Sequence, residues 1–191
     1  MSFLSMPRPA AARRLFLGQS GLVLSGAAVA LLAGQDALAA QAKASGGTAA
    51  DVRILNTALG AELEAIAAYQ LGAESKLLQQ PVLDLALSFQ GHHKEHADLL
   101  AKTIAKLGGT PVTAKAKYDF PTDSLKSQAD VLGFAARLEQ GAVSAYLGAV
   151  PLFGHHDLAK AAASILGDEA MHWAVLRQAL GQAPVPSAFV S

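Results

Sequence analysis

Six side chains that can bind a metal ion occur at matching positions in two halves of the sequence. They are Glu62, His93, His96, Glu139, Glu169 and His172. In each half the first glutamate opens a segment, ELEAIAAY or EQGAVSAY, and these two glutamates are 77 positions apart. The pair that follows, with members three residues apart, recurs after 76 positions. Features that repeat with nearly one offset indicate an internal duplication.

The first glutamate of each half interrupts an apolar stripe. Glu62 lies between Leu59 and Ile66 at helical spacing, which marks a packed face. A carboxylate in such a place needs a compensating partner. The chain contains no Cys, so a metal would bind through oxygen and nitrogen atoms, a donor set that suits Fe, Mn or Zn. We therefore expect a divalent metal site, with a metal-free network of His–Glu hydrogen bonds as the alternative.

Several neighbouring residues are given a different role. His93 keeps two interpretations, a direct ligand or the hydrogen-bond partner of a buried carboxylate. His92 and Asp168 occupy matching positions in the two halves, and we interpret both as surface residues or as groups that orient a ligand. Glu64 is expected to lie in solvent, although it could supplement the site.

The tyrosines and the remaining histidines are also expected to be structural. Tyr69 and Tyr146 follow the glutamates by seven residues and should pack in the core with their hydroxyl groups hydrogen-bonded. His155 and His156 lie at the start of a predicted helix and should face solvent.

Four helices of about 25 residues must position these side chains. The apolar pattern predicts them over residues 49–75, 81–107, 128–150 and 157–181. Thr48 with Asp51 and Ser127 with Asp130 have capping spacing at two helix starts, and glycines follow two of the helix ends. Each candidate ligand falls near the middle of its helix, so antiparallel hairpins bring all of them to one level. The segment 110–124 is long enough to span a helix, which lets the second and third helices run parallel.

This arrangement resembles the ferritin-like superfamily, in its exported branch of ferritin-like domain proteins. The resemblance covers about residues 49–181, and the segment DEAMHWAVL is its most specific part. It implies an all-α four-helix bundle with a long crossover, in which each half supplies Glu from one helix and Glu-x-x-His from the next. The ligands implied are Glu62, His96, Glu139, Glu169 and His172, and the favoured ion is iron, with manganese or zinc as alternatives.

The sequence departs from that pattern at one position. His93 stands where the resemblance implies Glu, so the centre would have three carboxylates and three imidazoles. Two divalent ions would then leave one net positive charge. We expect either one ion or an unequal pair.

The first 39 residues are predicted to be an export signal. Arg13 and Arg14 precede an apolar stretch and then the small-residue segment Ala37 to Ala39, in the order of a signal peptide. The arginine pair resembles a twin-arginine signal, with an ordinary secretory signal or an uncleaved anchor as alternatives. We expect export to the periplasm or cell envelope, with membrane contact only through an uncleaved signal. Residues 40–48 are then a linker, 49–181 the bundle and 182–191 a C-terminal tail.

Composition restricts the function without deciding it. Lys and Arg together number 15, as do Asp and Glu, and no basic patch indicates nucleic-acid binding. The expected partners are metal ions, an unidentified redox partner and, in a homodimer, a second copy of the chain. Redox handling of iron or manganese with oxygen or peroxide is one hypothesis, and a structural or stress-protective bundle without catalysis is the alternative. A third hypothesis is an interaction module that uses the apolar tail, residues 184–190. Whether the protein is an enzyme therefore stays open.

Overall fold

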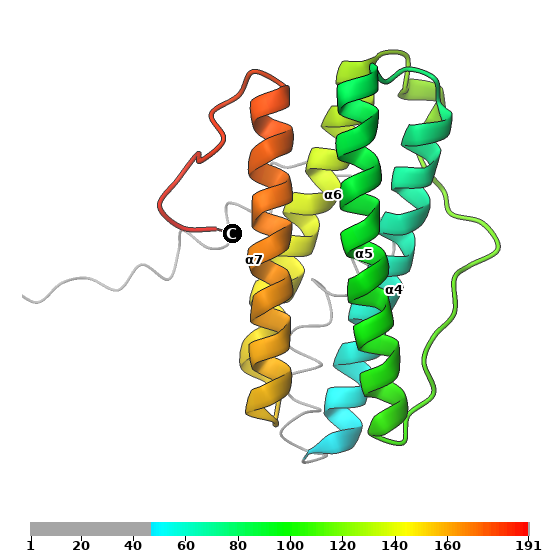
Figure 1. Ribbon diagram of the computed structural model, residues 1–191. Coiled ribbons are helices and arrows are strands. Elements are labelled where there is room, and N and C mark those ends of the chain that lie inside the picture. The colour runs from blue at the N-terminus through cyan, green and yellow to red at the C-terminus, as the bar shows by residue number, and fades with distance from the viewer. Residues whose placement is uncertain (1–46, 191) are drawn as a thin grey trace, which may run out of the picture.

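The computed structural model describes residues 47–190, and within them it contains four long α-helices and no β-strand (Figure 1). The helices are α4 (Thr48–Glu74), α5 (Gln80–Lys106), α6 (Gln128–Ala149) and α7 (His156–Ala179). Two short 3-10 helices, η1 (Thr122–Ser124) and η2 (Val150–Leu152), lie in the connections. The predicted export signal and residues 40–46 of the predicted linker lie outside the described residues. None of the described helices has the length and hydropathy needed to span a bilayer.

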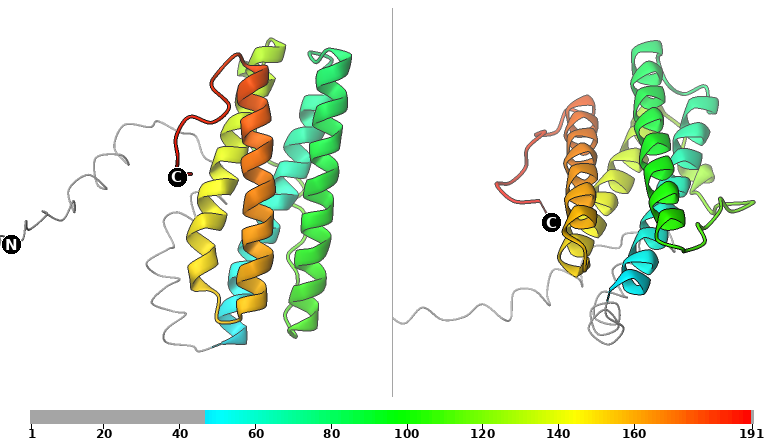
Figure 2. Two further views of the ribbon diagram at one scale, coloured as in Figure 1. Left: turned by 60° about the vertical axis from the view of Figure 1, so that its left-hand side comes forward. Right: turned by 60° about the horizontal axis from the view of Figure 1, so that its bottom comes forward.

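The four helices form two antiparallel hairpins, α4 with α5 and α6 with α7 (Figures 1 and 2). Short connections join the helices within each hairpin. Residues 107–127 return along the length of the bundle, so that α5 and α6 run in the same direction (Figure 1). This is the all-α four-helix arrangement with one long crossover that the sequence predicted.

The crossover is attached near both of its ends. Asn56 of α4 donates from Nδ2 to the carbonyl oxygen of Thr110 at 3.1 Å and accepts the N–H of Val112 at 2.8 Å. Towards the other end, Phe120 packs edge-on against Phe134 of α6, with ring centroids 5.7 Å apart. Most side chains between these two anchors are exposed.

Local sequence signals end two of the helices and begin a third. At the end of α5, Gly108 has a φ of 79°, and the N–H of Gly109 donates to the carbonyl oxygen of Ile104 at 2.9 Å. Only glycine adopts this left-handed conformation without strain, and Gly181 repeats it after α7 with a φ of 70°. At the start of α6, the hydroxyl of Ser127 accepts the N–H of Asp130 as the capping spacing predicted.

The predicted cap at the start of α4 was wrong. No side chain caps this helix, and Asp51 is fully buried instead of lying in the first exposed turn. Its carboxylate accepts the N–H of Gly154 at 2.8 Å and contacts Nδ1 of His155. Asp51 therefore ties the start of α4 to the α6–α7 connection. His155 and His156 face solvent as expected, although Nδ1 of His155 also contacts the Asp51 carboxylate.

The apolar core is divided into two clusters. One contains Leu55, Ala58, Leu59, Ala97, Leu100, Ile104, Tyr146, Ala162 and Ile165. The other contains Tyr69, Phe89, Leu132, Ala136, Trp173 and Leu176. Burying one large aliphatic or aromatic side chain stabilises the fold by about 1.5–3 kcal/mol. Most buried charged and imidazole residues lie between the two clusters, at mid-height of the helices, whereas Asp51 lies at the start of α4.

Candidate metal centre

All six predicted ligands come together between the two apolar clusters. Five of them, from all four helices, are at most 2% exposed: Glu62, His93, Glu139, Glu169 and His172. The side chain of His96 is 14% exposed. The structure thus brings the six side chains to one level, whereas their binding of a metal stays a prediction.

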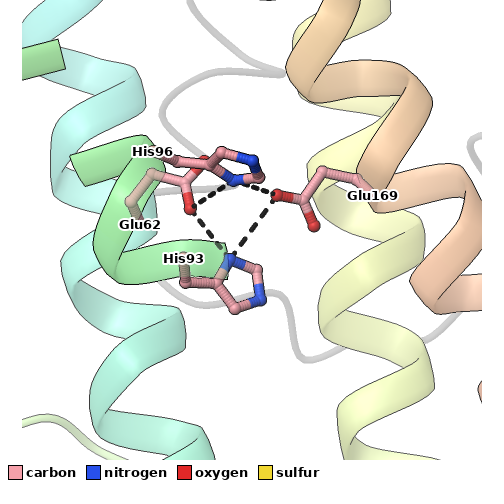
Figure 3. A group of neighbouring side chains, drawn as sticks. All are labelled: Glu62, His93, His96 and Glu169. Atoms are coloured by element: carbon pink, nitrogen blue, oxygen red, sulfur yellow. Dashed lines mark hydrogen bonds and ion pairs between the residues drawn. The ribbon is translucent and has the colours of Figure 1, made fainter. Parts of the chain in front are cut away.

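The first group of donor atoms comes from Glu62, His93, His96 and Glu169 (Figure 3). Nδ1 of His93 lies 2.8 Å from Oε2 of Glu62 and 3.5 Å from Oε1 of Glu169. Nδ1 of His96 lies 3.1 Å from the same Glu169 oxygen and 3.6 Å from Oε2 of Glu62. Ligands about 2.0–2.2 Å from one ion have separations of this size.

The second group comes from His93, Glu139, Glu169 and His172. Nδ1 of His172 lies 3.5 Å from Oε1 of Glu139 and 3.5 Å from Oε2 of Glu169. Nε2 of His93 lies 3.3 Å from Oε1 of Glu139. His93 and Glu169 therefore belong to both groups, and Glu169 offers a different oxygen to each, as a carboxylate that bridges two ions would.

Several donor atoms of the centre have no hydrogen bond. Nδ1 of His96, Nδ1 of His172 and both carboxylate oxygens of Glu169 are buried without a hydrogen-bond partner. Each unsatisfied buried group costs about 1–3 kcal/mol. A cation placed among these atoms would satisfy all four, so the donor set fits a divalent metal ion.

His93 is arranged differently from the other two histidines. Both of its ring nitrogens lie within hydrogen-bond distance of a carboxylate. Nδ1 of His93 is 2.8 Å from Oε2 of Glu62, and Nε2 of His93 is 3.3 Å from Oε1 of Glu139. Of the two interpretations of His93 from sequence, the partner of a buried carboxylate describes this geometry. Its ligation of a metal stays a prediction.

The three imidazoles have raised pKa values. Burial alone would lower the pKa of His93, but hydrogen bonds with Glu139 and Glu62 raise it to about 11. The pKa values of His96 and His172 rise to about 9, because contacts with neighbouring carboxylates outweigh the effect of burial. Burial would raise the pKa of Glu139, yet close contacts with the imidazoles of His172 and His93 hold it well below its usual range. A metal ion must therefore displace protons from this centre.

Two tyrosines connect the hairpins at the centre. The hydroxyl of Tyr146 on α6 donates to Oε1 of Glu62 on α4 at 2.6 Å. In the reciprocal direction, the hydroxyl of Tyr69 on α4 donates to Oε1 of Glu139 on α6. Burial and the neighbouring carboxylates raise the pKa of both tyrosines, so both act as neutral donors. Both tyrosines pack in the core with their hydroxyl groups hydrogen-bonded, as the sequence predicted. The sequence did not predict that their hydrogen-bond partners are Glu139 and Glu62.

His92 and Asp168 lie beside the centre on its more exposed side. Oδ2 of Asp168 is 3.4 Å from Nε2 of His96 and 3.3 Å from Nε2 of His172, the nitrogens that point away from the centre. Asp168 is thus placed to orient both imidazoles, as groups beside metal ligands commonly do. The side chain of His92 is 45% exposed and lies 3.0 Å from Oδ2 of Asp168.

A cavity of about 50 Å³ lies between α4 and α6 beside Glu62, His93 and Glu139. Its remaining lining is mostly small or aliphatic and includes Ile54, Ala58, Ala61, Ala65, Leu138, Ala142 and Ala145. Glu64 also lines it and is only 5% exposed, so the expectation that it lies in solvent was wrong. The face of α4 that carries Glu64 is built from small residues. Because such residues give only a weak apolar pattern, the sequence did not predict that α6 packs against this face.

Comparison with known proteins identifies related folds. The family described as Ferritin-like domain matches residues 50–182. A conserved hypothetical protein from Mycobacterium tuberculosis is 26% identical, with a TM-score of 0.64 over 73% of this chain and 96% of that one. A ferritin-like, diiron-carboxylate protein from Bacillus anthracis is 22% identical, with a TM-score of 0.62 over 71% of this chain and 99% of that one, a likeness of fold alone. No curated protein matches the chain.

Proposed function

Because the chain belongs to the ferritin-like domain family, we propose that it is a metal-binding protein whose resident ion is iron or manganese. The observation that carries this proposal is the set of buried donor atoms without hydrogen bonds on His96, Glu169 and His172. One ion would bind between Glu62, His96 and Glu169. A second would bind between Glu139, His172 and the other oxygen of Glu169.

The two ions would not bind equally. Three carboxylates do not neutralise two divalent ions, and His93 stands between Glu62 and Glu139 with a nitrogen facing each. One ion together with a protonated His93 balances three carboxylate charges. We therefore propose one tightly bound ion and a second that binds more weakly.

The first experiment measures metal content directly. Metal-free protein is incubated without oxygen with Fe(II), Mn(II) or Zn(II), freed of excess metal by gel filtration, and analysed by mass spectrometry for metal per chain. The proposal requires at least one tightly held ion per chain for iron or manganese. Protein that leaves the column without stoichiometric metal in every case would reject it.

We further propose that the bound metal reacts with oxygen or peroxide. A redox-active ion would supply one-electron chemistry, for which the side chains here have no equivalent. The apolar cavity beside Glu62 and Glu139 supports this proposal because it suits a small apolar molecule such as dioxygen. The carboxylates and the neutral tyrosine donors would hold the centre in place during the reaction.

Filling the cavity tests this role. Ala142→Leu places a larger side chain in the lining and should slow oxygen uptake by the Fe(II)-loaded protein about tenfold or more, with Fe(II) binding unchanged. Ala163→Leu makes the same change at an exposed position of α7 and serves as the matched control. Oxygen uptake no faster than that of free Fe(II) in buffer would instead favour the non-catalytic bundle.

We also propose that the protein is exported to the periplasm or cell envelope. The support is the order of charged, apolar and small residues over positions 1–39. The mass of the protein isolated from its native cell should correspond to a chain that begins near residue 40. Replacing Arg13 and Arg14 together by Lys should block maturation if the twin-arginine route is used, and normal maturation would indicate the ordinary secretory route.

A further inference from the structure

We propose that His92, Asp168 and His172 form an outer cation site through which metal ions reach the buried centre. The proposal adds an entry route to the proposed function and rests on it. The outer site uses the nitrogen of His172 that points away from the centre, together with two residues that contribute to neither group of donor atoms inside.

The three donor atoms are spaced as ligands of one ion. Nδ1 of His92 lies 3.0 Å from Oδ2 of Asp168 and 3.0 Å from Nε2 of His172. Nε2 of His172 lies 3.3 Å from the Asp168 oxygen. Ligands about 2.1 Å from an ion and at right angles to one another are about 3.0 Å apart. Two imidazoles and one carboxylate on one face of an ion are a donor set used for Fe(II), with the opposite face left for water.

The outer site differs from the centre in its access to water. The side chains of His92 and Asp168 are 45% and 21% exposed, whereas Glu169 is fully buried. A hydrated ion can therefore exchange part of its water for protein ligands before it loses the rest. The cavity between α4 and α6 is mostly apolar and would offer a cation no such exchange.

His172 connects the two sites. Its Nδ1 lies 3.5 Å from Glu139 and 3.5 Å from Glu169, while its Nε2 faces His92 and Asp168. A neutral imidazole has one lone pair, so His172 serves one site at a time. With an ion outside, its Nδ1–H points at the inner carboxylates. With an ion inside, its Nε2–H is free to donate to Asp168. The change of tautomer accompanies the passage of the ion.

Substitution of His92 distinguishes an entry site from a site whose residues only orient the ligands of the centre. Asp168 already contacts the outward nitrogens of both His96 and His172, so it can orient them without help. The polar partners of His92 are only Asp168 and His172 among the contacts described for residues 47–190. Its removal therefore takes a ligand from the outer site and leaves the six residues of the centre in place.

The test follows the loading of metal-free full-length protein with Co(II), whose visible absorption reports binding, in a stopped-flow instrument. His92→Gln should slow the filling of the centre at least tenfold, while equilibrium dialysis should still show the tightly bound ion. His156→Gln removes an exposed histidine at the far end of α7 and should load as the wild type does. Equal loading rates for His92→Gln and the wild type would overturn the proposal.

A second measurement does not depend on a variant. Crystals of the wild-type chain soaked briefly in Co(II), before a second inner ion occupies His172, should show an anomalous difference peak within ligand distance of His92 and Asp168, and its absence would also overturn the proposal. An ion found there with the centre empty would support the outer site and reject the proposed function. A centre that fills equally fast without His92 would reject the outer site alone.

Discussion

The α4–α5 hairpin and the α6–α7 hairpin surround one centre with equivalent side chains, but they differ at two adjacent positions. Where α7 carries Asp168 and Glu169, α5 carries His92 and His93. Glu169 offers one oxygen to each half of the centre, whereas His93 presents a nitrogen to Glu62 and another to Glu139. The imidazole of His93 thus makes two buried hydrogen bonds where Glu169 makes none, but it lowers the negative charge available to hold cations.

The two hairpins agree where the side chains hold the scaffold. Tyr69 and Tyr146 make reciprocal bonds to the glutamate of the other hairpin. The two differences at positions 92/168 and 93/169 concern residues that would face an ion or another titratable group. The comparison therefore predicts unequal roles in metal binding and equal roles in stability.

The largest effect should come from Glu169→Gln. Glu169 contributes to both groups of donor atoms, so the variant should bind Fe(II) or Mn(II) at least a hundredfold more weakly, as measured by competition with a chelating dye. His93→Gln should weaken the first ion less than tenfold, since Glu62, His96 and Glu169 remain. Glu95→Gln, at an exposed position of α5, is the matched control. Equal losses at positions 169 and 93 would contradict the unequal roles.

His93→Glu should sharpen the comparison by making the two hairpins alike. The centre would then have four carboxylates and two imidazoles, enough charge to neutralise two divalent ions. We expect the second ion to bind about ten- to a hundredfold more tightly than in the wild type, measured as metal per chain across a Mn(II) titration. The metal-free variant should melt at a lower temperature than the metal-free wild type. The substitution removes the imidazole that pairs with Glu62 and Glu139 and puts a carboxylate beside them instead. An unchanged affinity for the second ion would show that the charge at position 93 does not limit the number of ions bound.

A smaller effect should follow pH and should be the same for both hairpins. The pKa values of His96 and His172 are both about 9, and each must lose a proton to ligate a metal. Metal affinity should rise about tenfold per pH unit between pH 7 and 9 for each ion bound, and then level off. An affinity independent of pH in this range would mean that neither histidine is a ligand.

The stability of the metal-free protein should follow pH in the opposite sense. The pKa of His93 is raised from 6.5 to about 11, so its stabilising effect is complete below pH 6.5 and is lost as pH rises towards 11. The pKa of Glu139 is lowered from 4.5, so its effect is present above pH 4.5 and is lost at lower pH. The melting temperature without metal should therefore be highest between about pH 4.5 and 6.5. A maximum at pH 8 or above would contradict these directions.

The smallest effect should come from the tyrosines. Tyr69→Phe and Tyr146→Phe each leave a buried carboxylate oxygen without its hydroxyl donor, which should lower the free energy of unfolding by about 1–2 kcal/mol. Urea denaturation of the metal-free protein measures both. Two similar losses would support equal scaffold roles, and a difference above about 1 kcal/mol would show that the hairpins differ in their scaffold as well.

The sequence predicted the helices well because their apolar stripes and end signals are local. It also predicted that Glu62, Glu139 and Glu169 meet inside, because each interrupts an otherwise apolar face. The burial of Glu64 was missed because alanine and glycine give little contrast between a packed and an exposed face. The contact of Asp51 with Gly154 was missed because it joins residues 103 positions apart, and no local pattern carries that information.

The exposed crossover has a consequence for how the molecule is assembled. Its anchors at Asn56 and Phe120 leave Lys115 and Lys117 exposed between them, where trypsin could cut. Cleavage there would leave two fragments, one for each hairpin, each with part of the ligand set. Such fragments would expose the apolar faces that meet in the intact bundle. If the two fragments associate again, a metal ion bound by ligands from both would stabilise their complex. Metal ligation by both hairpins would then hold the two halves together in place of the peptide chain.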